Sequence, residues 1–222
     1  MWKRGETNTL LDILFSYIDS TISDHGIFRY SWSSWGKISP EMYRSNQPFP
    51  FQIRRNIKKY KIKTIINLRG ERHCSSYYLE KKQCMKSDIK LINFPLSSRD
   101  LPTYEKTLNL KKLYNNIEYP ALIHCKSGAD RVGMAAALYL ISRRRKNLLI
   151  AKKQLSLKHL HLKYAKTGIL DFFFDSAIKQ GVIESNDFFN WMKIKYKKEA
   201  LKKEFKYNKL SDLISDFILK RE

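Results

Sequence analysis

The 222-residue sequence has little cysteine, no long apolar run and no internal repeat. Its three cysteines, Cys74, Cys84 and Cys125, are too few for a disulfide framework, which favours a reducing compartment, the cytoplasm, over an oxidising one. Long low-complexity linkers are absent as well. One globular domain with terminal extensions is therefore the expected organisation.

The most apolar stretch near the N-terminus, LLDILFSYI, follows Lys3 and Arg4 and so has the outline of a signal peptide. It contains Asp12, is too short to span a bilayer and lacks a small-residue cleavage site. We therefore expect an amphipathic helix that lies either on the domain or on a membrane face.

Acidic residues are scarce: 21 Asp and Glu stand against 43 Lys and Arg, for a formal net charge of +22. Such a charge favours polyanionic partners, namely phosphorylated lipids, an anionic membrane surface or nucleic acid. The alternative is a basic composition that only leaves a solvated surface. Two basic segments, at 142–147 (SRRRKN) and 193–207, have the same two explanations: they bind acidic lipid headgroups or RNA, or they are solvated helix faces.

Three short segments rich in β-branched residues are predicted as buried strands, at 63–68, 90–96 and 121–125. Segments with apolar residues at helical spacing lie at 51–60, 75–86 and 104–117, and from about 129 to the end. Strands that alternate with helices indicate βαβ units. The predicted fold class is therefore α/β, with a central, mostly parallel sheet and helices on both of its faces.

The stretch LIHCKSGADRVG leads the third predicted strand through His124 and Cys125 into a short polar loop. A turn between a strand and a helix directs backbone N–H groups into a concavity at the positive end of the helix, which binds anions. The same amides stabilise a thiolate, so Cys125 is expected to be a nucleophile at neutral pH. Gly128 allows close backbone approach, and Arg131 can hold two oxygens of a phosphate. The pattern predicts a phosphate cradle with a thiolate at its base.

The pair His124-Cys125, followed after five residues by Arg131, resembles the signature of the cysteine-dependent protein tyrosine phosphatase superfamily. CKSGADR is most similar to the dual-specificity-like and phosphoinositide-phosphatase branches, and MYRSNQP, TIINLRGE and NFPLSSRDLP resemble a bacterial member family. The resemblance covers about residues 40–175. It implies a phosphatase domain at 39–180, with a phosphate-binding loop between strand and helix. An N-terminal helical or linker segment at 1–38 and a basic helical C-terminal extension at 181–222 would flank that domain.

The resemblance also implies residue roles. Cys125 attacks phosphorus to form a phosphocysteine, while Arg131 and the loop amides stabilise the transition state. His124 supports the loop geometry or is simply a packed strand residue. Substrate binding falls to the rest of the loop: Lys126, Ser127, Gly128, Ala129 and Asp130. Nothing in this loop resembles a metal-ligand set, and no cofactor is expected.

Several assignments stay open. The superfamily usually supplies the leaving group's proton from an aspartate on a separate loop, and Asp100 in SSRDLP is the candidate here. The spacing from Asp100 to Cys125 is shorter than is common in the superfamily, so Asp130 and Glu105 remain competitors. Lys126 resembles the lysine that helps inositol-lipid phosphatases hold a second phosphate, or is an exposed lysine. Arg69 and Glu71, at the end of the strand at 63–68, either support the phosphate loop or form a surface ion pair.

The predicted function is metal-independent hydrolysis of phosphomonoesters on phosphotyrosine, phosphoserine or phosphothreonine proteins, or on phosphoinositides. One alternative is a catalytically weak phosphate-binding adaptor that keeps Arg131 and the cradle. Another is an RNA 5′-phosphatase, which would suit the charge. The expected partner is a phosphorylated protein or phosphoinositide, with an anionic membrane surface next and nucleic acid last. The expected location is the cytoplasm, either free or peripheral at a membrane.

Overall fold

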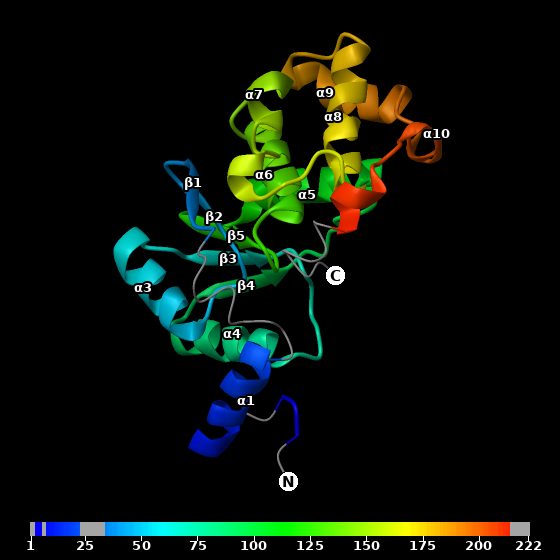
Figure 1. The fold of residues 1–222 in the computed structure, drawn as a ribbon. Coiled ribbons are helices and arrows are strands. Elements are labelled where there is room, and N and C mark those ends of the chain that lie inside the picture. The colour runs from blue at the N-terminus through cyan, green and yellow to red at the C-terminus, as the bar shows by residue number, and fades with distance from the viewer. Residues whose placement is uncertain (1–2, 6–7, 23–33, 214–222) are drawn as a thin grey trace. The chain divides into compact units, whose positions relative to one another are not determined.

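A computed structural model describes residues 3–5, 8–22 and 34–213 (Figure 1). The chain forms two compact units, one made of Met1–Pro95 and Glu118–Gly128 and the other of Leu96–Ile117 and Ala129–Glu222. The boundaries expected after residues 38 and 180 stay predictions. Parts of the predicted terminal regions, at 23–33 and 214–222, lie outside the described residues.

A five-stranded sheet in the order β1-β2-β5-β3-β4 forms the first unit. Its strands are β1 (Gly36–Ser39), β2 (Met42–Ser45), β3 (Thr64–Asn67), β4 (Lys90–Asn93) and β5 (Ala121–His124). β1 and β2 are antiparallel, and the other neighbours are parallel. The α/β class, a mostly parallel sheet flanked by helices, is confirmed. The three predicted strands are β3, β4 and β5, whereas β1 and β2 were not predicted.

The register of the parallel strands places β5 in the centre of the sheet. His124 at the end of β5 pairs with Ser45 of β2 on one side and with Asn67 of β3 on the other. The carboxyl ends of these strands therefore meet at one edge, which in open α/β sheets is where ligands bind. The loop that begins at Cys125 leaves the sheet at this edge.

Among the described residues, three helices belong to the same unit: α1 (Leu10–Ile22), α3 (Pro50–Tyr60) and α4 (Ser75–Lys86). α3 and α4 pack against each other, and α1 packs against α4 (Figure 1). A cluster of buried side chains from the sheet and these helices forms the core: Tyr43, Ile53, Ile62, Ile65, Cys84 and Leu122. Burial raises the pKa of the Cys84 thiol, which keeps it protonated and favours an inert packing role.

The second unit is helical. Its helices are α5 (Tyr104–Asn116), α6 (Asp130–Ser142), α7 (Leu148–Lys152), α8 (Ile169–Lys179), α9 (Ser185–Ile194) and α10 (Lys198–Glu204), with 3₁₀ turns at Leu157–His159 and Lys166–Gly168. Every residue of the alanine-rich α6 is buried. Phe173 of α8 packs edge-on against Phe188 and Trp191 of α9. Within the described residues, no helix combines the length and apolar character needed to cross a bilayer.

Candidate active site

Cys125 follows β5 directly, and its side chain is buried. The loop curls back on it, so that the Gly128 N–H donates a hydrogen bond to the Cys125 Sγ, with 3.2 Å between nitrogen and sulfur. A main-chain donor aimed at sulfur stabilises a thiolate more than a thiol. This donor and its acceptor both lie in the first unit.

Three consecutive loop carbonyls are held by residues around β2. The Gln47 N–H donates to the Lys126 carbonyl at 3.1 Å, and the Ser34 hydroxyl donates to the Ser127 carbonyl at 3.2 Å. The Arg44 guanidinium donates to the Gly128 carbonyl at 2.8 Å. A planar trans peptide places its N–H opposite its C=O. Holding these carbonyls outward therefore turns the N–H groups of Ser127 and Gly128 to the other side of the loop, which is the side a bound anion needs.

Gly128 is required for two separate reasons. Its φ of +78° lies in the left-handed region, which a residue with a side chain rarely adopts. A Cβ at this position would also lie 2.0 Å from the Ser34 Oγ and 2.8 Å from the Asn46 backbone nitrogen. The loop can therefore approach β2 this closely only with glycine.

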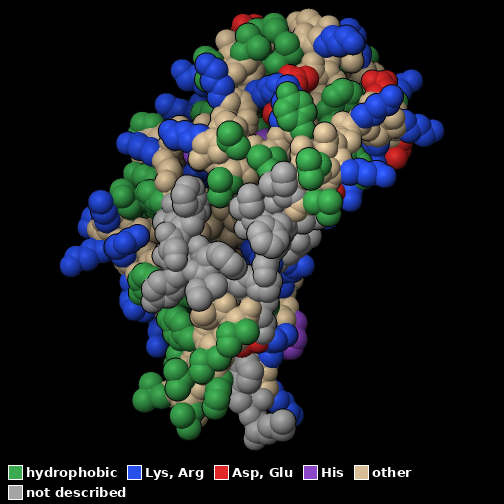
Figure 2. All heavy atoms as spheres, viewed as in Figure 1, with side chains coloured by type: hydrophobic (Ala, Val, Ile, Leu, Met, Phe, Trp, Pro, Cys, Tyr) green, Lys and Arg blue, Asp and Glu red, His purple; other side chains and the backbone are tan. Residues whose placement is uncertain are grey.

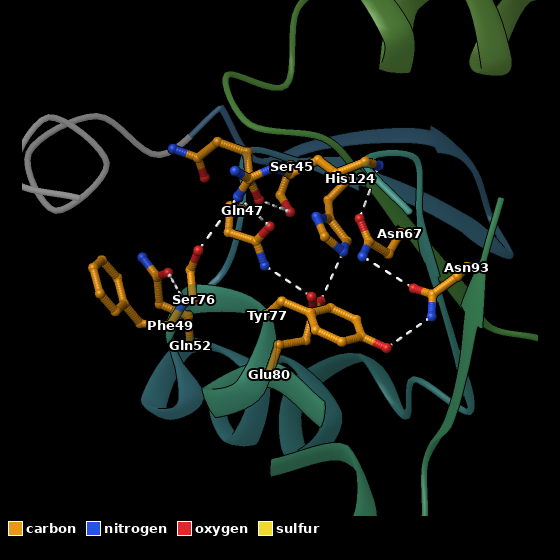
Figure 3. Close-up of polar contacts among 12 residues, drawn as sticks. Ser45, Gln47, Phe49, Gln52, Asn67, Ser76, Tyr77, Glu80, Asn93 and His124 are labelled. Carbon is orange, nitrogen blue, oxygen red and sulfur yellow. Dashed lines mark hydrogen bonds and ion pairs between the residues drawn. The ribbon is translucent and has the colours of Figure 1, made fainter. Parts of the chain in front are cut away.

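His124 and Glu80 form a fully buried pair (Figure 3). The His124 Nε2 lies 2.7 Å from the Glu80 Oε1, at ion-pair distance, although neither His124 ring nitrogen has an aligned hydrogen bond among the described residues. The other carboxyl oxygen, Oε2, accepts a hydrogen bond from the Gln47 side-chain amide at 2.8 Å. Through Glu80, α4 thus contacts the residue that precedes Cys125. Sequence reasoning missed Glu80, although an acidic residue between Leu79 and Cys84 on a buried helix face was a signal.

Arg69 lies buried just after β3 and donates hydrogen bonds to Gln47, the residue that also contacts Glu80, and to Ser76. Its Nη1 donates to the Gln47 Oε1 at 3.0 Å and to the Ser76 hydroxyl at 3.3 Å. Gln47 in turn holds the Lys126 carbonyl through its backbone N–H. Glu71 is exposed and lies 3.8 Å from the Lys81 Nζ. Of the two readings of Arg69, the geometry favours support of the loop.

The loop continues in the second unit, where Asp130 and Arg131 begin α6 and are both buried. The Asp130 Oδ1 lies 2.7 Å from the His161 Nδ1, and the other ring nitrogen contacts Asp171. Burial lowers the pKa of His161, but the two carboxylates outweigh it and raise that pKa to about 9. His161 is therefore an imidazolium at neutral pH and engages Asp130. Sequence reasoning missed it, since HLHLKY carries no motif.

The three candidates for the general acid have different surroundings. Asp130 is buried against His161, and Glu105 is exposed in the first turn of α5. Asp100 is partly exposed and pairs with Lys198 at 2.6 Å and Lys202 at 3.2 Å. Burial raises the pKa of Asp100, but the two ammonium groups outweigh that effect and hold it below its usual range. The choice of acid stays a prediction.

Within the described ranges, no three His, Cys, Asp or Glu side chains gather as they would around a metal ion.

Known proteins share the sequence and the fold to different degrees. Residues 52–167, just over half of the chain, match the family model described as PTP-NADK, a DSP-PTPase phosphatase fused to NAD+ kinase. The core catalytic domain of the Saccharomyces cerevisiae PP-IP phosphatase SIW14, solved with citrate, is 19% identical with a TM-score of 0.50, over 66% of this chain and 89% of its own. The phosphatase Tk-PTP in its active form is 18% identical with a TM-score of 0.50, over 65% of this chain and 98% of its own.

No curated protein matches the chain in sequence. At such low identities the solved structures show a shared fold, whereas the family model covers the segment that carries Asp100, Cys125 and Arg131. The chain therefore belongs to the DSP-PTPase phosphatase family, within the cysteine-dependent protein tyrosine phosphatase superfamily.

Proposed function

We propose that this phosphatase hydrolyses phosphomonoesters through a phosphocysteine on Cys125. The observation that carries the proposal is the hydrogen bond that the Gly128 N–H donates to the buried Cys125 Sγ. It lies in a loop whose carbonyls are held outward. Sulfur attacks phosphorus as the bond to the leaving oxygen breaks. Water then attacks the phosphorus of the phosphocysteine, which releases phosphate and the thiolate. Arg131 supplies the planar pair of donors for the phosphate oxygens.

Asp100 remains the candidate for the acid that protonates the leaving oxygen. Because Lys198 and Lys202 hold the pKa of Asp100 low, donation from this residue needs acidic conditions or the arrival of a negatively charged substrate. Asp130, held by His161, is the competing donor within the loop.

The substrate class follows from charge. A net charge of +22 and a lysine next to the nucleophile favour a substrate with more than one phosphate, so a phosphoinositide is the first choice and a phosphotyrosine protein the second. In solution, the attraction of exposed charges is screened over about 10 Å at ordinary ionic strength, so this preference is expected to weaken with added salt.

A substrate panel tests the proposal. The purified chain is expected to hydrolyse p-nitrophenyl phosphate equally well with and without a metal chelator, and a bisphosphorylated phosphoinositide better than a phosphotyrosine peptide at low salt. The panel also includes a PP-IP compound, the class in the name of the yeast relative, and an RNA with a 5′-triphosphate. Phosphate binding without turnover of any substrate would show the adaptor instead, and selective action on the RNA end would show an RNA 5′-phosphatase.

A further inference from the structure

Helix α1 is oriented with its polar side toward the protein. Ser16 and Ser20 are its only buried residues. Six large apolar side chains are exposed instead: Leu10 (86%), Leu11 (65%), Leu14 (53%), Phe15 (44%), Ile18 (45%) and Ile22 (68%). At about 100° per residue these six positions fall within an arc of about 140°, on the side opposite Ser16 and Ser20. A surface helix of a water-soluble domain normally has the reverse arrangement.

Polar contacts hold α1 in this orientation. Asp19 accepts hydrogen bonds from the Arg4 guanidinium at 2.6 Å and 3.1 Å, and from the Ser75 hydroxyl of α4 at 2.6 Å. Tyr17 stacks on Phe49, with ring centroids 6.3 Å apart. At the start of the helix, the Thr9 N–H donates to the Asp12 carboxylate and the Asp12 N–H to the Thr9 hydroxyl. The helix is thus capped and anchored through its polar side.

We propose that α1 docks this chain on an anionic membrane, with Leu10, Leu11, Leu14 and Ile18 inserted among the lipid acyl chains. The helix has 13 residues, too few to span a bilayer, so it lies in the plane of the interface. A helix of this kind binds by burying its apolar side in the headgroup region, while cations beside it attract acidic lipids.

The charge around α1 fits that partner. Exposed cations lie on α3 and α4 of the same unit, at Arg55, Lys58 and Lys59 of α3 and at Lys86 of α4. Figure 2 shows hydrophobic side chains gathered over α1 and, on the same face, Lys and Arg side chains over α3. Each lysine or arginine near an anionic surface adds about 1 kcal/mol of attraction.

A second copy of the chain or another protein fits less well. The six exposed side chains present an apolar area of roughly a few hundred Å², whereas a stable protein interface buries about 800 Å² on each partner. Two copies of a chain with a net charge of +22 also repel each other. A lipid surface needs no matching shape and supplies the opposite charge.

Vesicle co-sedimentation with the full chain tests the proposal. We expect binding to vesicles of phosphatidylcholine with phosphatidylserine, and at least about tenfold weaker binding to phosphatidylcholine alone or at high salt. The double variant Leu14→Glu/Ile18→Glu is expected to lose about tenfold or more of the binding. Its matched control is Leu149→Glu/Ile150→Glu on α7, where the same side chains are 50% and 45% exposed and the charge change is the same. The control is expected to bind like the unmodified chain.

Hydrolysis of p-nitrophenyl phosphate by both variants separates the docking proposal from the proposed function, because a soluble substrate does not need α1. Equal loss of binding in the two double variants would overturn the proposal and leave a general charge effect. No vesicle binding at all would overturn it too. Self-association offers a third contrary outcome, measured by sedimentation velocity. If the unmodified chain self-associates and the Leu14→Glu/Ile18→Glu variant does not, α1 is an interface between copies and the membrane proposal is overturned.

Discussion

At the residue scale, the loop after β5 depends on small and buried side chains rather than on Cys125 alone. Gly128 leaves room for Ser34 and Asn46, and Arg44 holds the Gly128 carbonyl. The spacing of Cys125 and Arg131 predicts a nucleophile and a phosphate cradle in this loop, because a strand, a turn and a helix are local features. It could not predict Ser34, Arg44 or Gln47, since those contacts join segments about 80 to 90 residues apart.

Gly128→Ala tests the closeness of this packing. A Cβ would meet the Ser34 Oγ and backbone atoms in a conformation that alanine disfavours, so the loop must shift and withdraw its amide from Cys125. We expect kcat/KM for an aryl phosphate to fall by about a hundredfold or more, in line with the loss of a positioned main-chain donor. Gly181→Ala is the control, since its φ is +82° and a Cβ there has open space. Similar activity losses in both variants would mean that backbone strain alone, not the loop contact, matters.

The general acid is a second residue-scale question. If Asp100 donates the proton, Asp100→Asn is expected to slow alkyl phosphates by about a hundredfold and aryl phosphates, with their better leaving groups, by much less. Lys198→Gln would remove a cation that lowers the pKa of Asp100, so the alkaline limb of the kcat profile should move to higher pH. Steady-state kinetics on both substrate types check this. A larger loss in Asp130→Asn, or equal losses on both substrates, would assign the role elsewhere.

At the element scale, buried polar side chains connect helices to the ends of the loop that follows β5. α4 reaches His124 of β5 through Glu80, and α8 reaches Asp130 at the start of α6 through Asp171 and His161. The strands β3, β4 and β5 and the helices around them were predictable from apolar periodicity. The side of α1 that is buried was not, because periodicity shows two faces and does not say which one meets the protein. All five strands have four residues, but β1 (GKIS) and β2 (MYRS) lack the two adjacent Leu or Ile residues that mark β3 (TIIN), β4 (KLIN) and β5 (ALIH).

Glu80→Ala tests the contact between α4 and β5. Removing the carboxyl leaves the Gln47 amide and His124 buried without their partner, so the free energy of unfolding is expected to fall by about 2–4 kcal/mol. The matched control, Glu71→Ala, removes an exposed pair with Lys81 and should change it by less than about 1 kcal/mol. Urea unfolding measures both. Similar small losses would show that Glu80 does not stabilise the strand end.

His161 predicts a pH dependence of stability. Its pKa of about 9 lies above the value of about 6.5 expected in the unfolded chain, so its contribution is full below pH 6.5 and is lost as the pH rises through 9. The loss is on the order of 1–3 kcal/mol in the free energy of unfolding. We expect His161→Gln to be less stable at pH 6 and to lack this decline. A variant with the same slope between pH 6.5 and 9 as the unmodified chain would contradict the charged state assigned to His161.

At the scale of the whole molecule, membership of a phosphatase family fixes the reaction class and leaves the substrate open. The net charge of +22 was readable from the sequence, and both proposals, of a multiply phosphorylated substrate and of an acidic lipid surface, start from it. Composition could not show that α1 exposes its apolar side, because the orientation of the helix depends on its contacts through Arg4, Asp19 and Ser75.

The central claim is that Cys125 is the nucleophile in a preformed phosphate cradle, and Cys125→Ser tests it most directly. A hydroxyl is a far weaker nucleophile at neutral pH, while the loop amides stay in place, so turnover of p-nitrophenyl phosphate should fall by about a thousandfold or more. Thermal unfolding with and without vanadate should show that the variant still binds the anion as the unmodified chain does. Loss of turnover with retained vanadate binding is the predicted result. Undiminished turnover in Cys125→Ser would contradict the account.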